Sequence, residues 1–232
     1  VWAWGGNDGA MLGDGTTTDL STPVLLPGLD SVVGIAGGAW HGLALKSDGT
    51  IWAWGDNTEG QDGDGVAPIK TTAQVVPLAS VTKTAAGYVH SLALKRDGTV
   101  WAWGDNLYGE LGDGTTTNRS TPVQVSGLTG VVALASGGWH SLALKADGTV
   151  WAWGNNGDGQ LGDGTITNRS TPVQVGGLSG VVALGGGGWH SLALKADGTV
   201  WAWGDNTGGQ LGDGTTTNRS TPVQVSGLSG VV

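Results

Sequence analysis

The sequence predicts an all-β fold, a β-propeller of four-stranded blades with about 50 residues per blade, present here as a partial array of four to five blades. The string VWAWG begins at residue 1 and its near-copies begin at residues 51, 100, 150 and 200, so the intervals are 50, 49, 50 and 50 residues. A second string, close to HSLALKADGT, keeps the same interval. Periods of this length are typical of repeat arrays and propellers, and no segment has the periodicity of an amphipathic helix.

One unit, residues 131–175, shows which strands to expect. Leu142 and Leu144 alternate with smaller residues, which is the period of a β-strand. Asp147-Gly148 then separates two apolar runs, and an Asp-Gly pair in that position is a strong hairpin signal because the turn needs positive φ. We therefore expect four short strands, at residues 131–135, 139–145, 149–153 and 172–175.

The paired tryptophans of each unit predict how the sheets pack. Trp151 and Trp153 share one face of a strand, and the smaller Val150 and Ala152 share the other. A large face against a small face suits sheets that stack on one another. We expect these recurring residues to build the blades: Trp52, Trp54, His90, Trp101, Trp103, His140, Trp151, Trp153, His190, Trp201 and Trp203.

The longest repeated motif carries a resemblance to a known family. The pattern GGxHSLALxxDGxVWAWGxNxxGQLG runs from Gly137 to Gly162 and from Gly187 to Gly212, and diverged copies occupy residues 37–63 and 87–112. It resembles the regulator of chromosome condensation repeat, in the form of bacterial-type tandem repeats. The resemblance implies a propeller of commonly seven blades, whose ring closes by combining strands from the two chain ends.

The number of repeats departs from that pattern. We expect a single propeller-type repeat domain over residues 1–232, with units starting near 1, 51, 100, 150 and 200 and with both terminal units incomplete. The only methionine is Met11 and the last unit stops early, which indicates a piece of a longer array. The chain is therefore expected to form an open arc, with association between chains as the alternative route to closure.

Composition limits the classes of partner. With 19 acidic and 10 basic residues, the net charge is −9, and the basic residues are scattered, so we expect no nucleic-acid partner. There is no cysteine and no apolar run long enough for a membrane span, so we expect neither disulfides nor membrane insertion. Near-identical later units suggest a repeated surface, in keeping with an extracellular or cell-surface protein of a bacterium.

The histidines do not predict a catalytic or metal site. His140 and Ser141 are adjacent on a strand and so point to opposite faces, which rules out a dyad between them. One histidine per blade also keeps the rings apart. We expect each histidine to hydrogen-bond to a neighbouring loop, and we expect no enzyme, no catalytic residue and no cofactor.

Polar loop residues suggest two further kinds of site, one for calcium and one for N-glycosylation. Asp105, Asn106, Asp113 and Asn118 carry the oxygen ligands that calcium accepts, but their spacing fits no calcium loop, and Asx-turns explain them as well. We therefore expect turns rather than calcium. Three sites match the N-x-S acceptor pattern for glycosylation, which matters only in a glycosylating secretory route: Asn118, Asn168 and Asn218.

The second unit is the irregular copy and the predicted partner-binding region. Asp62 stands where other copies have Leu, and Tyr88-Val89 replaces Gly-Trp before the histidine. Binding residues tend to lie on loops held by a rigid scaffold, although drift in an older copy explains the same differences. The predicted partner-binding residues are Glu59, Asp62, Lys70, Tyr88 and Tyr108.

Three functions follow in order of preference. The first is a non-catalytic scaffold for protein–protein recognition or for surface and structural attachment. The alternative is regulation of a specific partner through one propeller face, since relatives in the resembled family include a nucleotide-exchange factor for a small GTPase and inhibitors of β-lactamase. The third, a hydrolytic enzyme, needs two converging carboxylates, and the only unusual loop acids are Glu59 and Asp62.

Overall fold

Eighteen β-strands make up the regular secondary structure of the computed structural model, which describes residues 1–66, 68–228 and 230–232. No helix that could cross a membrane occurs within these ranges. The strands are β1 (Trp2–Gly5), β2 (Leu20–Leu25), β3 (Val32–Gly37), β4 (His41–Lys46), β5 (Ile51–Gly55), β6 (Lys70–Val76), β7 (Val81–Ala86), β8 (His90–Lys95), β9 (Val100–Gly104), β10 (Arg119–Gln124), β11 (Val131–Ser136), β12 (His140–Lys145), β13 (Val150–Gly154), β14 (Arg169–Gln174), β15 (Val181–Gly186), β16 (His190–Lys195), β17 (Val200–Gly204) and β18 (Arg219–Gln224).

The strands form four antiparallel sheets of four strands and one sheet of two. We call them blade 1 (β3–β6), blade 2 (β7–β10), blade 3 (β11–β14) and blade 4 (β15–β18), preceded by the two-stranded sheet β1–β2. Within each blade, strands that are consecutive in sequence are neighbours in the sheet. The predicted class, an all-β propeller fold with four-stranded sheets repeating about every 50 residues, is confirmed.

The fourth strand of a blade is longer than predicted. In blade 3 it begins at Arg169, which pairs with Gly154, and not at Pro172. The register then shifts before Val173 pairs with Ala152. Pro172 lies inside this irregularity, where the missing N–H removes no ladder hydrogen bond.

The predicted Asp-Gly hairpin is present in each full blade. In blade 3, the Asp147 carboxylate accepts hydrogen bonds from the backbone N–H and the hydroxyl of Thr149, at 3.0 and 2.6 Å. Gly148 has a φ of 78°, a conformation that glycine adopts without a steric penalty. This turn joins β12 to β13 and fixes their register.

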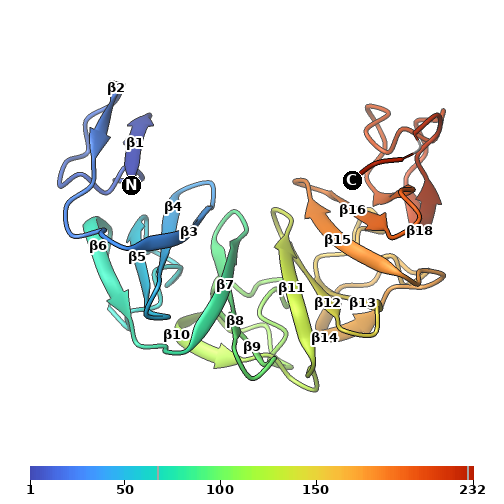
Figure 1. Cartoon of the computed structure of the whole chain (residues 1–232), viewed down its shortest axis with the longest axis horizontal. Helices are drawn as coiled ribbons and strands as arrows, with labels where there is room; N and C mark the ends of the chain where they lie inside the picture. The colour runs from blue at the N-terminus through green and yellow to red at the C-terminus, as the bar shows by residue number, and fades with distance from the viewer. Residues whose placement is uncertain (67, 229) are drawn as a thin grey trace.

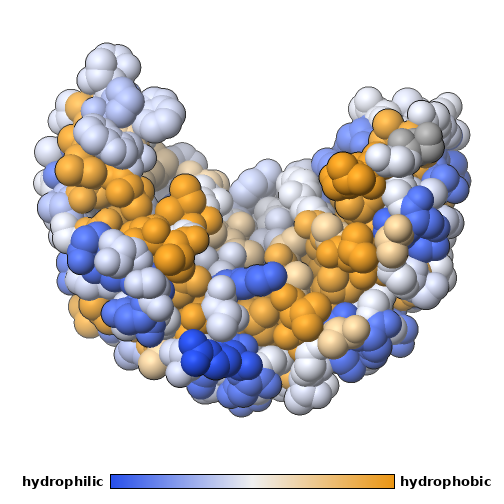
Figure 2. Space-filling model, in the orientation of Figure 1, coloured by the Kyte–Doolittle hydropathy of each residue, from blue (hydrophilic) through white to orange (hydrophobic). Residues whose placement is uncertain are grey.

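The blades lie side by side in an open arc with the two chain ends far apart, as the repeat number predicted (Figure 1). The first strands of successive blades, β3, β7, β11 and β15, contact one another and line the concave side, while the fourth strands lie outermost (Figure 1). Hydrophobic residues gather along this inner side (Figure 2). They include the exposed side chains of Val33, Ile35, Val132 and Val182.

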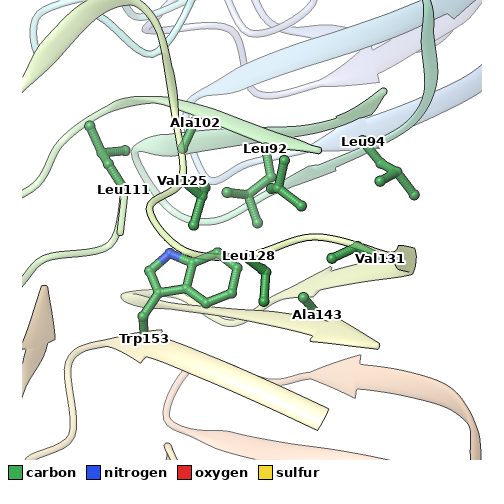
Figure 3. Packing of buried hydrophobic residues seen from close by; sticks show 10 residues of the cluster. Leu92, Leu94, Ala102, Leu111, Val125, Leu128, Val131, Ala143 and Trp153 are labelled. Carbon is green, nitrogen blue, oxygen red and sulfur yellow. The ribbon is translucent and has the colours of Figure 1, made fainter. Parts of the chain in front are cut away.

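Large and small faces interlock between neighbouring blades, as predicted. Trp153 of blade 3 is fully buried and packs against blade 2 residues that include Leu92, Ala102 and Leu111 (Figure 3). The same arrangement places Trp203 of blade 4 against blade 3. Each blade therefore completes its core only with the help of its neighbour.

The two end faces of the array are uncovered within the described chain. Trp2 and Trp4 of the two-stranded sheet are largely exposed. At the other end, Leu192 and Leu194 are only partly buried, whereas their blade 3 counterparts Leu142 and Leu144 are buried. Association between chains through these faces stays a prediction.

Candidate functional site

One edge of every blade carries the long irregular loops, and we call this surface the loop face. It consists of the loops that join the third strand to the fourth (residues 56–66, 105–118, 155–168 and 205–218) and the short segments before the second strand (38–40, 87–89, 137–139 and 187–189). The two kinds of segment are bonded together, since the Asn155 N–H donates to the Trp139 carbonyl at 2.9 Å. The Asp-Gly hairpins lie at the opposite ends of the same strands and form the hairpin face.

A buried asparagine holds each long loop in shape. In blade 2, the Asn106 amide donates to the carbonyl oxygens of Thr115 and Thr117, both at 3.1 Å, and its Oδ1 accepts the Leu111 N–H at 2.9 Å. The Asn106 backbone N–H donates to Asn118 Oδ1 at 2.8 Å. Blades 3 and 4 repeat these contacts through Asn156 and Asn206. The loops are therefore rigid platforms rather than loose connections.

The polar residues considered for calcium are engaged in these turns. The Asp113 carboxylate accepts hydrogen bonds from the Thr115 N–H at 2.9 Å and forms an ion pair with Arg119 at 2.7 Å. Asn118 Nδ2 donates to Glu59 of blade 1 at 2.6 Å. Among the described residues, no three His, Cys, Asp or Glu side chains gather in a metal-binding arrangement.

The recurring histidines join neighbouring blades. His140 Nε2 of blade 3 lies 2.8 Å from Ser191 Oγ of blade 4. That hydroxyl donates to the Gln160 carbonyl of blade 3 at 2.9 Å, and Trp203 Nε1 donates to the same carbonyl at 2.8 Å. The arrangement recurs with His41, Ser91, Gln61 and Trp103, and with His90, Ser141, Glu110 and Trp153. The predicted bond to a neighbouring loop is thus replaced by a bond to a strand serine of the next blade.

This geometry determines the protonation state of the buried histidines. Because the Ser191 hydroxyl gives its proton to a carbonyl, His140 must donate from Nε2, and Nδ1 is left buried without a partner. Burial lowers the pKa of His41 to about 4 and those of His90 and His140 to about 3. The rings are neutral and structural, in keeping with their place between sheets.

An aromatic cluster lies on the loop face at the middle of the arc. Tyr88 and Tyr108 of blade 2 both meet the Trp139 ring of blade 3 edge-on, with ring centroids 5.8 and 6.0 Å apart. Trp40 of blade 1 and Trp189 of blade 4 continue the series and are 47% and 39% exposed. The structure therefore brings together two of the predicted binding residues, Tyr88 and Tyr108, through a tryptophan that the prediction did not include.

Glycines allow Tyr88 to cross the inner ends of two further blades. A Cβ atom on Gly138 would lie 2.6 Å from the Tyr88 ring, and one on Gly188 would lie 2.6 Å from its hydroxyl oxygen. These glycines and their neighbours line a hollow of about 260 Å³ together with Tyr88. Tyr88, which departs from the repeat pattern, thus packs against glycines of blades 3 and 4 that follow the pattern.

The remaining predicted binding residues lie in different environments. Glu59 is exposed on the loop face. Lys70 is largely buried and forms an ion pair with Asp64 at 3.0 Å. Asp62 is fully buried, because it stands at the position of the core residues Leu111 and Leu161. Of these three residues, only Glu59 is exposed to a partner, and its carboxylate also accepts the hydrogen bond from Asn118.

Two carboxyl groups are buried in blades 1 and 2 without adequate hydrogen bonding. Neither oxygen of Asp62 has a partner, and Glu110 lacks one for Oε1. Glu110 occupies the position at which Gln160 donates to Asn155 Oδ1 at 2.8 Å, and it faces Asp105 instead. Burial raises the pKa of both Asp62 and Glu110 to about 8.

The two buried carboxyl groups and the buried histidines together predict that the free energy of unfolding is greatest near pH 6.5. From pH 6.5 to 8, folded Asp62 and Glu110 bind protons that the unfolded chain has released, so the free energy of unfolding falls as pH rises. Below pH 6.5, the unfolded chain protonates histidines that stay neutral when folded, so histidine burial destabilises the fold as pH falls toward 4. Urea unfolding midpoints between pH 5 and 9 measure the loss of stability on both sides of this maximum.

The double variant Asp62→Asn with Glu110→Gln supplies the control for this profile. Both replacements keep the side-chain size and remove the ionisable group, so the fall between pH 6.5 and 8 should disappear. A wild-type stability that rises steadily from pH 6.5 to 8 contradicts the assignment.

Part of this site was visible in the sequence and was missed. Trp40, Trp139 and Trp189 each precede a histidine outside the VWAWG strings. Trp139 was expected to begin a strand at residues 139–145, but the strand β12 begins at His140. A third recurring tryptophan, in addition to the two of each VWAWG string, was the available signal for a further role. Glu110, which stands where the later copies of the GQLG string have Gln, was a second signal that the sequence offered.

The four-stranded antiparallel sheets, stacked around an arc with their long loops on one face, define a repeat protein of the β-propeller class. The sequence matches the RCC1-like domain over residues 1–232, and the chain belongs to that family.

Individual relatives match shorter stretches. The human E3 ubiquitin-protein ligase HERC2 is 37% identical over 78 residues, which cover 33% of this chain and 2% of HERC2. The zebrafish (Danio rerio) protein RCC2 homolog is 43% identical over 67 residues, 28% of this chain and 14% of that protein. The chain thus spans a small part of these relatives' sequences.

Solved structures show the same fold over nearly the whole chain. Human WBSCR16 superposes with a TM-score of 0.87 at 26% identity, covering 97% of this chain and 62% of that one. Yeast RCC1 (Prp20), solved bound to Kap60, gives a TM-score of 0.85 at 22% identity and covers 97% and 56%.

Proposed function

We propose that the chain is a non-catalytic recognition module that binds a partner protein through its loop face. The observation that carries the proposal is the aromatic cluster of Tyr88, Tyr108 and Trp139, with Tyr88 partly exposed. Aromatic side chains on a rigid surface are typical anchors of protein interfaces. Yeast Prp20, which shares the fold, has been crystallised with Kap60 and studied for binding to Gsp1p and histones, which supports a protein-binding role.

The chemistry of the described residues supports the non-catalytic part of the proposal. The buried histidines are held between sheets by Ser91, Ser141 and Ser191 and do not reach the surface. Burial raises the pKa of Asp62 and Glu110 to about 8, and these two groups lie in different blades. Burial also raises the pKa of Asp105, which Glu110 faces, but both of these side chains are buried, so the pair is not open to a substrate.

A site-specific photo-crosslinking experiment tests this function. Tyr88 is replaced by p-benzoylphenylalanine, which keeps an aromatic ring at the centre of the cluster, and the protein is irradiated in extract of its source cells. We expect a discrete crosslinked partner, identified by mass spectrometry.

The matched control carries the same photoreactive residue in place of Asp147 on the hairpin face. Equal crosslinking from both positions, or crosslinking from the Asp147 position alone, contradicts recognition by the loop face. A partner that crosslinks only from position 88 establishes the face, whatever the partner's chemistry.

A further inference from the structure

The acidic residues are sorted onto one side of the molecule. The segments between the third and fourth strands, with their counterpart between β1 and β2, hold fourteen of the nineteen acidic residues and no lysine or arginine. The hairpin face, in contrast, carries Lys46, Lys95, Lys145 and Lys195 together with its turn aspartates. The net charge of −9 therefore originates on the loop face.

The basic residues nearest the loops neutralise only a small part of this negative charge. Each full blade has one, at the first position of its fourth strand, and each is paired within its own loop. The pairs are Lys70–Asp64, Arg119–Asp113, Arg169–Asp163 and Arg219–Asp213. Even with the buried Asp62 and Glu110 set aside, acidic side chains remain without a basic partner among the described residues, including Asp56, Glu59, Asp158 and Asp205.

Two of the loops that carry these carboxylates are hydrogen-bonded through their backbones to the segments that carry exposed tryptophans. The Asp56 N–H donates to the Trp40 carbonyl at 2.8 Å, and the Asp205 N–H donates to the Trp189 carbonyl at 2.9 Å. In blades 1 and 4, an acidic residue and an exposed tryptophan therefore stand on directly adjoining segments of the loop face. A carboxylate next to an open aromatic face is the environment that favours a lysine or arginine side chain.

The chain itself shows this pairing on its other face. Lysine ammonium groups lie 4.5 to 5.7 Å from tryptophan ring centroids in all four blades. The pairs are Lys46–Trp52, Lys95–Trp101, Lys145–Trp151 and Lys195–Trp201. On the loop face, no cation of the described chain occupies Trp40, Trp139 or Trp189 in the same way.

We infer that the loop face recognises an extended, arginine- or lysine-rich segment of a partner protein, whose basic side chains alternate between the aromatic rings and the unpaired carboxylates. This inference rests on the proposed function and names the chemistry of the partner. The hollow beside Tyr88, lined largely by glycine backbone, gives an extended main chain close access to the middle of the face. Complementary charge also speeds the encounter, and its effect weakens as salt rises.

The test uses the whole chain and a defined probe. The probe is a short fluorescein-labelled peptide in which arginine alternates with glycine and serine, and binding is followed by fluorescence anisotropy. The matched peptides carry citrulline or glutamate in place of arginine. We expect the arginine peptide alone to bind, with a dissociation constant that increases with salt.

Two sets of variants separate specific recognition from general attraction. Glu59→Gln with Asp158→Asn and Asp205→Asn removes three negative charges from the loop face, and Asp97→Asn with Asp147→Asn and Asp197→Asn removes three from the hairpin face. We expect the first set to raise the dissociation constant at least about tenfold and the second to leave it nearly unchanged. Tyr88→Ala should weaken binding by a similar factor and Tyr88→Phe should restore it, because the ring is retained.

Three results overturn the inference: no binding of the arginine peptide, equal binding of the citrulline peptide, or equal losses from the two charge sets. The melting temperature of each variant shows whether it is folded. The proposed function is judged separately, by crosslinking from position 88. A crosslinked partner together with an inert arginine peptide leaves loop-face recognition standing and removes only the basic partner.

Discussion

Replacing Trp153 by alanine is expected to lower the free energy of unfolding by about 3–5 kcal/mol, the largest loss predicted for this chain. The ring is fully buried against Leu92, Ala102 and Leu111 of blade 2, so its removal opens a cavity between two blades. It also removes the 2.7 Å hydrogen bond from Nε1 to the Glu110 carbonyl. Urea unfolding followed by far-UV circular dichroism measures the change.

Trp151→Ala is the matched control for this variant. Trp151 belongs to the same strand, but it is only partly buried, and its ring lies 5.7 Å from the Lys145 ammonium group. We expect a loss of about 1 kcal/mol, because removal of a partly exposed ring leaves no closed cavity. Equal losses from the two variants contradict the assignment of Trp153 as the residue that joins blades 2 and 3.

Replacing Asp62 by leucine is expected to stabilise the chain by about 2 kcal/mol at pH 7. The carboxyl group is fully buried and neither oxygen has a hydrogen-bond partner. The equivalent positions in other units hold Leu12, Leu111 and Leu161, all buried, so the surroundings are shaped for an aliphatic side chain. The gain should increase up to about pH 8, because burial has raised the pKa of Asp62 to about 8 and folding of the wild type must then protonate a carboxylate that is ionised in the unfolded chain.

Asp62→Asn distinguishes the charge from the missing apolar surface. This variant keeps the size and polarity of the side chain but cannot ionise, so we expect a gain already at pH 6, where the unfolded wild-type chain has released a proton that the folded chain binds. The gain should be larger at pH 8 than at pH 6, and at both pH values it should stay below that of Asp62→Leu, because the amide is still a buried polar group. Unfolding midpoints for the two variants at pH 6 and pH 8 decide the matter, and a destabilised Asp62→Leu protein contradicts the leucine-like environment.

Local patterns were sufficient to predict the blade. The Asp147-Gly148 turn and the alternation of Leu142 and Leu144 predicted strands that the structure contains, because hairpins depend on residues close together in sequence. The paired tryptophans predicted the stacking for the same kind of reason, since a strand's two faces follow from its period. The extra residues at the start of β14 escaped prediction, because they pair across an irregularity that sequence does not mark.

The binding surface depends on contacts between units and was predicted only in part. Tyr88 and Tyr108 were recognised as exceptions in the repeat, but their meeting at Trp139 joins two blades and three loops. Asp62 was also recognised as an exception, and only the structure shows that it is fully buried. An exception in a repeat indicates that a position matters without indicating whether it faces solvent or core.

The sequence by itself determined the repeating four-stranded blade, the turns and the large and small faces, because each follows from short-range periodicity. The tertiary structure decided which residues meet across blades. It placed His140 against Ser191, 51 residues away, and joined the acidic loops to the segments that carry the exposed tryptophans on one face. Such neighbours are brought together by the stacking of whole sheets, and stacking is a property of the array rather than of any single unit.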